Sequence, residues 1–163
     1  MDDAQRQRGQ QWLTKLLQLM EINAAVNITK VEVESDATTA CWLTIDESSL
    51  SEEQVGLLIG DQGETIDSIQ YLANAILHIG LDKEKSGYFM IDIDDYRGQR
   101  QAQLQVLAEE VAEQVRQTGQ EVEMKSLSSV ERRQIHSILS QDQDLQTESR
   151  GHEPDRRLVV RLR

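Results

Sequence analysis

Two glycines enclose two polar residues in the segment Gly60-Asp61-Gln62-Gly63, and this spacing is the first feature of the sequence that could do chemistry. Glycine has no Cβ, so a loop built from it lets another backbone come close. Apolar residues at helical spacing precede and follow the loop, which therefore leads into the N-terminus of a helix. That helix end presents free amides and the positive end of the helix dipole. We expect these four residues to bind an anionic backbone, such as the sugar–phosphate chain of a nucleic acid.

A second group of side chains suited to phosphate lies in the last third of the sequence. Arg132 and His136 are four residues apart in a predicted helix over 128–139, so they lie one turn apart on the same side. Arginine offers a planar fork of donors, and histidine can donate to a phosphate or become charged near neutral pH. We expect both side chains at the edge of the core with their polar ends in reach of solvent. Three arginines of the following loop and strand extend this site: Arg150, Arg156 and Arg157.

Each of these residues also has a structural alternative. An arginine and a histidine four apart beside a core often stabilise the fold rather than bind a ligand. Arg156 and Arg157 could form a solvated strand end. Glu153 is near enough in sequence to pair with an arginine and hold the loop. Sequence alone leaves these alternatives open.

The sequence gives little evidence for a metal site. Asp92, Asp94 and Asp95, with Glu84 nearby, could bind a divalent cation. However, Asp92 and Asp94 alternate with isoleucines, as in a strand with one wet face, and no glycine-containing loop of the EF-hand type accompanies them. We therefore predict no metal ion and no cofactor.

Catalysis has little support either. Cys41 lies between apolar residues, which is typical of a core position, and the three histidines are dispersed without metal-ligand spacing. The best enzymatic alternative is a phosphodiesterase that uses His136 and Arg132, but a second general acid–base group is missing. We predict that the chain is not an enzyme.

The elements that must position these residues follow from hydrophobic periodicity and capping signals. A capping box at Ser51 opens a short helix before the glycine loop, and another at Ser128 opens the helix of Arg132. Apolar residues at helical spacing, among them Met20, Ile76 and Leu107, predict the buried helix faces. A turn at 35–39 joins two strands in a hairpin, and Ser86-Gly87 breaks the chain after the helix that follows the loop. The remaining predicted elements are helices 10–22 and 97–118 and strands 29–34, 41–45, 88–94, 122–125, 145–149 and 157–162.

The net charge of −12 over 163 residues is unfavourable for a nucleic-acid binder, but its distribution is uneven. Residues 1–96 hold 6 basic and 18 acidic side chains, whereas residues 125–163 hold 8 basic and 6 acidic ones. A single cysteine fits a reducing compartment, and the sequence shows neither a secretory signal nor a long apolar run. These features predict a soluble cytoplasmic protein that does not enter a membrane.

The order helix, strand, strand, short helix, glycine loop, helix, strand resembles the type II KH domain of bacteria. The likeness extends to the letters Leu-Ile-Gly, Gly-Glu-Thr-Ile-Asp and Gln-Tyr-Leu around loop 60–63. The second half resembles the R-three-H domain, named for an arginine and a histidine with three residues between them. Its pattern here is Arg132-x-x-x-His136, then Thr147-x-Ser149-x-Gly151-x-Glu153-Pro154-x-Arg156-Arg157. A KH domain followed directly by an R-three-H domain is the C-terminal architecture of the Jag/KhpB family, which the sequence resembles over about residues 10–163.

This resemblance implies an α+β fold: a type II KH-like domain, whose three-stranded sheet has helices on one side, and then a small α+β R-three-H domain. It implies domains at 10–96 and 97–163, with helix 97–118 as a connector. It also implies binding of single-stranded RNA, or of single-stranded DNA, with low sequence specificity and a role in post-transcriptional regulation. Jag proteins usually carry an extra N-terminal domain. We expect this chain to lack it, so envelope-linked roles are not carried over.

Some residues depart from the family pattern and define an alternative function. Asp61 and Gln62 stand where basic or neutral residues are frequent, Glu64 follows them, and Asp155 replaces a frequent tyrosine before Arg156. One carboxylate facing a phosphate costs on the order of 1 kcal/mol near a screened surface. The alternative is therefore a protein–protein adaptor with a weakened KH site. The resemblance implies a suitable partner, a second small KH protein like KhpA.

Overall fold

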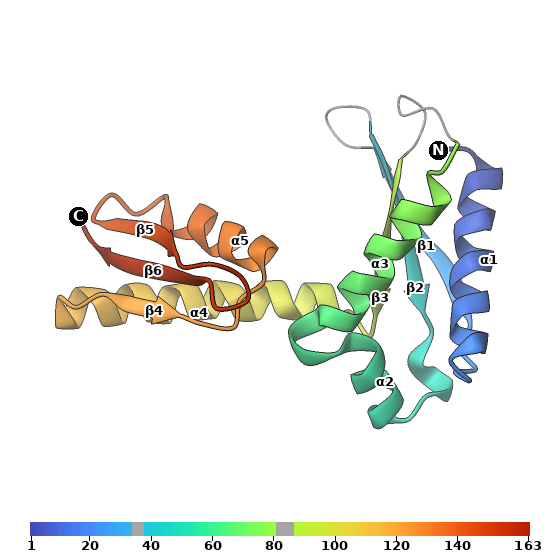
Figure 1. Ribbon diagram of the computed structural model, residues 1–163, viewed down its shortest axis with the longest axis horizontal. Coiled ribbons are helices and arrows are strands. Elements are labelled where there is room, and N and C mark those ends of the chain that lie inside the picture. The colour runs from blue at the N-terminus through green and yellow to red at the C-terminus, as the bar shows by residue number, and fades with distance from the viewer. Residues whose placement is uncertain (34–37, 81–86) are drawn as a thin grey trace. The chain divides into compact units, whose positions relative to one another are not determined.

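The computed structural model describes residues 1–33, 38–80 and 87–163, which form two compact units (Figure 1). Unit 1 is Met1–Tyr96 and unit 2 is Arg97–Arg163. Glu84, Ser86 and most of the predicted turn at 35–39 lie outside the described residues.

Unit 1 consists of a three-stranded sheet with helices on one face. Its strand order is β1-β2-β3, in which β1 and β2 are antiparallel and β2 and β3 are parallel. Helix α1 packs on β1 and helix α3 packs on β3 (Figure 1), and both helices share one hydrophobic core with the strands. This arrangement confirms the predicted hairpin and the predicted KH-like α+β fold. The elements are α1 (Asp3–Leu19), β1 (Val26–Val33), β2 (Thr39–Ile45), η1 (Glu47–Ser49), α2 (Glu52–Ile59), η2 (Asp61–Gly63), α3 (Glu64–Leu77) and β3 (Tyr88–Ile93).

The first helix differs from its prediction at both ends. It begins at Asp3, not at residue 10, because Asp2 and Gln5 form a capping box in which each side chain accepts from the other residue's backbone N–H, at 2.8 and 2.9 Å. It ends at Leu19, so Met20 is exposed and not part of the buried face. The predicted capping boxes at Ser51 and Ser128 are confirmed.

Three other burial predictions are wrong. Asp92 was expected on a wet strand face but is only 7% exposed, paired in register with Thr44 of the central strand. Ile76 is exposed because α3 fills the core with the row Ile66, Ile69, Ala73 and Leu77, which leaves Ile76 on the flank. Leu107 is exposed because it lies on the flank of α4 (Tyr96–Thr118), outside the row of residues that this helix buries in its core.

Unit 2 is a second small sheet covered on one face by two helices. Its strand order is β4-β6-β5, antiparallel throughout. Leu145, Leu158 and Val160 project from one sheet face into a core shared with α4 and α5. The elements after α4 are β4 (Val122–Met124), α5 (Ser129–Leu139), β5 (Leu145–Arg150) and β6 (Arg157–Leu162). The expected α+β fold of this half is confirmed.

Candidate nucleic-acid interface

The glycine loop adopts a backbone that only glycine tolerates at its two ends. Gly60 has φ +75° and Gly63 has φ +87°, both in the left-handed region. A Cβ on Gly60 would lie 2.7 Å from the backbone N of Thr65, and one on Gly63 would lie 2.8 Å from the ring atom Cε1 of Tyr96. No side chain caps the N-terminus of α3, which begins at the next residue. The loop therefore presents a helix end with close backbone access, as the sequence predicted.

Acidic side chains surround this helix end. Asp61 and Gln62 are exposed at the tip of the loop. Glu64 and Asp67 occupy the first turn of α3, where their carboxylates already interact favourably with the positive end of the helix dipole. Attraction between the helix end and a phosphate is offset accordingly. The loop has the geometry of an anion site but not the charge of one.

Arg132 is buried rather than solvent-accessible, which corrects the sequence-based expectation. It is 5% exposed. Its Nη1 donates to the carbonyl oxygen of Leu127 at 2.6 Å and to that of Arg156 at 3.3 Å, and its Nη2 donates to the carboxylate of Glu153. The guanidinium thus ties helix α5 to the loop between β5 and β6. Glu153 holds the loop, as the structural alternative proposed.

His136 and Arg156 are exposed and lie over the edge strand β5. Nδ1 of His136 is hydrogen-bonded to Oγ1 of Thr147, and Nε of Arg156 donates to Oγ of Ser149 at 2.9 Å. Thr147 and Ser149 are two residues apart on one strand, so they face the same side of the sheet at a separation of about 6.8 Å. We call these four side chains the polar row. The terminal nitrogens of the guanidinium remain as donors to a ligand, and the second nitrogen of the imidazole donates when the ring is charged or when Nδ1 accepts from Thr147.

Arg150 and Arg157 lie on the opposite face of the sheet from the polar row. They are cross-strand partners in register, and residues of that parity face away from α4 and α5. Arg150 pairs with Glu121 at 3.0 Å and Arg157 pairs with Glu123 at 2.7 Å. The hydrogen bond from Arg150 lowers the pKa of the Glu121 carboxyl below its usual range, so the pair stays charged. The structure separates these two arginines from His136 and Arg156.

Thr147 and Ser149 belong to the sequence motif but are not among the predicted contact residues. Their alternation in a strand beside the helix of His136 was the available signal. The predicted site places Arg150, Arg156 and Arg157 together, although odd and even positions of a strand face opposite sides of the sheet. Arg156 differs from the three other predicted arginines, because its hydrogen-bond partner is a neutral hydroxyl and not a carboxylate.

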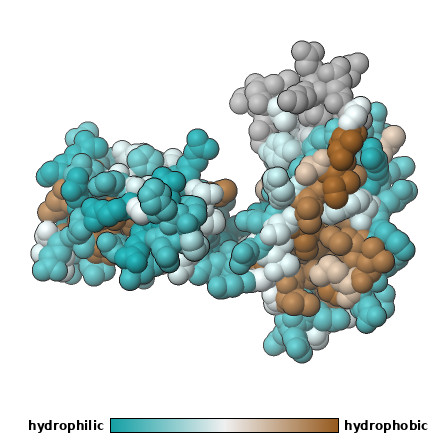
Figure 2. Space-filling view, in the orientation of Figure 1, coloured by the Kyte–Doolittle hydropathy of each residue, from teal (hydrophilic) through white to brown (hydrophobic). Residues whose placement is uncertain are grey.

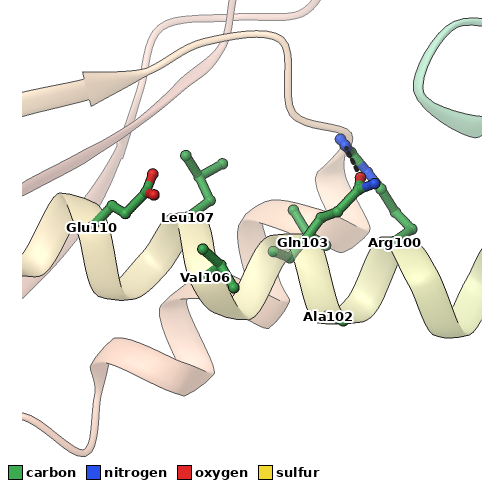
Figure 3. Close-up of a pocket in the computed structure, with 7 residues that line it drawn as sticks. Arg100, Ala102, Gln103, Val106, Leu107 and Glu110 are labelled. Atoms are coloured by element: carbon green, nitrogen blue, oxygen red, sulfur yellow. Dashed lines mark hydrogen bonds between the residues drawn. The ribbon is translucent and has the colours of Figure 1, made fainter.

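A depression of about 510 Å³ lies beside α4 (Figure 3). Val106 and Leu107 line it, with Gln103 and Glu110 among the polar residues, and Arg100 donates to Gln103 Oε1 at 3.4 Å. It brings no catalytic or phosphate-binding constellation together. Among residues 1–33, 38–80 and 87–163, no three side chains are grouped so as to hold a metal ion. None of the helices formed by these residues combines the length and apolar character that a membrane crossing requires.

Comparisons with known proteins match both halves of the chain. Residues 11–86 match the family model of the KhpA/KhpB KH domain, and residues 102–162 match that of the R-three-H domain. The RNA-binding protein KhpB of Clostridium symbiosum is 34% identical over 117 residues, which are 71% of this chain and 51% of that protein. The protein of the same name from Lactiplantibacillus plantarum is 39% identical over 109 residues, 66% of this chain and 33% of that protein. The chain thus spans about half or less of these relatives' length.

Proposed function

The chain belongs to the Jag/KhpB family, and from this membership we propose that it binds single-stranded RNA with low sequence specificity and acts in post-transcriptional regulation. Single-stranded DNA is the second candidate ligand. The observation that carries the proposal is the polar row of His136, Thr147, Ser149 and Arg156. It presents the exposed side chains of His136, from helix α5, and of Arg156, from the loop before β6, and within the part of the chain that the structure describes no carboxylate pairs with Arg156.

We assign Arg156 and His136 to direct phosphate or base contacts. The Arg156 guanidinium is exposed and held by one neutral hydrogen bond, so its terminal nitrogens can form a fork with a phosphate or stack on a base. Arg132 positions Arg156, because it donates to the backbone carbonyl of that residue. Arg150 and Arg157 contribute less in this proposal, since their charge is neutralised by glutamates on the other sheet face.

Fluorescence anisotropy of a labelled single-stranded RNA, with Arg156→Gln and Arg157→Gln as a matched pair, tests the assignment. The two residues are adjacent in sequence but belong to opposite faces. Loss of one charged hydrogen bond should weaken binding about tenfold in Arg156→Gln and reduce the slope of log K against log salt by about one. Arg157→Gln should change affinity less than about twofold. Equal loss in both variants would contradict the assignment to the polar row.

Residues Gly60, Asp61, Gln62 and Gly63 form the second proposed contact, because the two glycines let a phosphate backbone come close to the loop. The Asp61→Lys variant probes it. Replacing one carboxylate by an ammonium at the exposed loop tip should tighten binding by about tenfold if a phosphate lies there, since two charge changes of about 1 kcal/mol are each partly screened. Unchanged affinity would place RNA on unit 2 alone, and the loop would lose its assigned role.

A second KH protein like KhpA is the proposed protein partner, and it corresponds to the adaptor alternative. Figure 2 shows an apolar band along α3 of unit 1. The exposed residues Leu72, Ile76 and Ile79 form it, at 46%, 40% and 72% exposure. Leu72 and Ile76 are four residues apart on one flank of α3, and Ile79 follows the end of that helix. Contiguous exposed apolar residues favour a protein contact over an RNA contact. Leu72→Glu should abolish pairing without changing RNA affinity, as measured by light scattering and anisotropy.

The KH and R-three-H families are not known as enzyme families, and we propose that the chain has no catalytic activity. We assign RNA binding to domains at 10–96 and 97–163, with α4 as their connector. A cytoplasmic location follows from the proposed RNA ligand.

A further inference from the structure

The outer edge of β3 is closed by side chains from α3. Strand β3 lies at the end of the sheet order, so one side of its backbone has no strand partner among the described residues of unit 1. Asn74 donates through Nδ2 to the carbonyl of Phe89 at 2.9 Å and accepts through Oδ1 from the N–H of Phe89 at 2.8 Å. Gln70 Oε1 accepts from the N–H of Ile91 at 3.0 Å. Nε2 of His78 lies 2.5 Å from the carbonyl oxygen of Gly87.

These contacts repeat with matched spacing along a helix and a strand. Positions 70, 74 and 78 advance by four residues, about 6 Å along an α-helix. Their partners 91, 89 and 87 recede by two residues, about 6.6 Å along a strand. In a parallel pair, alternate residues direct both backbone groups to the same side, so 87, 89 and 91 all face the free edge. The primary amide of Asn74 bonds N–H and C=O of one residue, as a residue of a fourth strand would.

This closed edge begins beside the glycine loop. Helix α3 starts at Glu64, directly after Gly63. At the other end, Tyr96 follows β3 by three residues, and its ring leaves no room for a Cβ on Gly63. A nucleic-acid strand held by its backbone at the loop and running along α3 would therefore bring its bases to the outer edge of β3. Backbone N–H and C=O groups of such an edge could hydrogen-bond base edges, and would thereby distinguish one base from another.

We propose that Gln70, Asn74 and His78 determine the low base specificity of unit 1 by occupying the edge of β3. Both backbone groups of Phe89, the N–H of Ile91 and the carbonyl of Gly87 are already bonded to α3, so a base arriving at these four groups gains no hydrogen bond. RNA is then held by its backbone alone. The inference rests on the proposed RNA binding, and it assigns to these three residues a role in specificity that goes beyond that function.

Anisotropy with labelled oligo(A), oligo(C) and oligo(U) tests this inference on the full chain, its Asn74→Ala variant and a Ser68→Ala control on the exposed part of the same helix. Wild type and control should bind the three oligomers within about threefold of one another. Asn74→Ala, which releases both backbone groups of Phe89, should separate the oligomers by at least about tenfold, the discrimination of one or two hydrogen bonds. Amide hydrogen exchange should show faster exchange at Phe89 in the variant alone.

Three other outcomes would overturn either this inference or the proposed function. If wild type binds RNA and Asn74→Ala shows faster exchange at Phe89 without any wider spread of affinities, the inference is wrong and the proposed function stands. If wild type binds none of the oligomers, the proposed function itself fails. Self-association of Asn74→Ala in sedimentation velocity would show that the edge accepts a protein strand, which also overturns the inference. Should Asn74→Ala not fold, Gln70→Ala, which removes the bond to the N–H of Ile91, must show the same trend.

Discussion

Replacement of Arg132 by alanine separates a positioning role from a ligand contact. The side chain is 5% exposed and donates to the carbonyls of Leu127 and Arg156 as well as to Glu153. The Leu127 carbonyl lies in a buried environment, so it loses its donor without gaining water, at about 1–3 kcal/mol. The Arg156 bond is longer and belongs to an exposed residue, so its loss costs less. The Glu153 carboxylate is 59% exposed, and its pairing adds at most about 1 kcal/mol.

These terms give an expected loss of about 2–4 kcal/mol in the free energy of unfolding of unit 2. A domain of this size typically has a total stability of about 5–15 kcal/mol. Each kcal/mol shifts its melting temperature by about 4–8 °C, so the change should lower that temperature by roughly 10–30 °C. Urea and thermal unfolding followed by circular dichroism measure both quantities. Glu153→Gln is the matched control, because it removes the ion pair but leaves both carbonyl bonds, and should cost less than about 1 kcal/mol.

RNA affinity should be measured on the Arg132 variants as well. Because Arg132 holds the backbone of Arg156, affinity should fall together with stability in Arg132→Ala. Arg132→Lys should rescue neither property fully, since an ammonium cannot reproduce the fork that spans two carbonyls. The reasoning is refuted if Arg132→Ala unfolds like wild type and yet loses RNA binding. That outcome would mean that the guanidinium contacts phosphate directly.

Further predictions concern the ion pair of Asp144 and the glycine loop. The hydrogen bond from Arg116 lowers the pKa of the Asp144 carboxyl below 3.8, so the pair stabilises the fold above that pH and its contribution is lost as pH falls through the lowered pKa. Asp144→Asn should therefore be less stable than wild type at about pH 6 in urea unfolding, and the difference should shrink as the pH falls through the lowered pKa. Gly63→Ala should destabilise unit 1 by about 1–3 kcal/mol, because φ is +87° and the ring of Tyr96 lies 2.8 Å from the new Cβ. Gly56→Ala, in an exposed helical position with nothing within 4 Å, should stabilise it by about 0.5–1 kcal/mol in the same thermal-unfolding assay.

Most of the fold was predictable because its signals are local. The capping boxes at Ser51 and Ser128 each satisfy a backbone donor three residues away, so the sequence determines where those helices begin. The same signal existed at Asp2 and Gln5, and its omission explains the wrong start of α1. Burial of Asp92 was not predictable, since alternation with isoleucines shows which residues share a face but not whether the second face is also covered.

The site was only partly predictable, because it depends on strand register and on long-range polar contacts. The four-residue spacing of Arg132 and His136 placed them on one side of a helix, yet one is buried and the other exposed. Arg132 donates to the backbone carbonyls of Leu127 and Arg156. A pattern of side chains in the sequence does not indicate which backbone carbonyl will accept a hydrogen bond. The contacts of α3 with the edge of β3 are hidden in the same way, since amides at four-residue spacing are typical of any solvated helix face.

The acidic composition is compatible with RNA binding because the charges are distributed locally. The surplus of acid belongs to unit 1, and the arginines of the outer sheet face in unit 2 are balanced by Glu121 and Glu123. Charges separated by more than about 8 Å are largely screened at physiological salt, so the polar row responds chiefly to its own neighbours. Few phosphates can then be neutralised at once. In the proposed function, affinity at unit 2 therefore comes from the placement of Arg156 and His136, and we expect the buried guanidinium of Arg132 to control it through the backbone of Arg156.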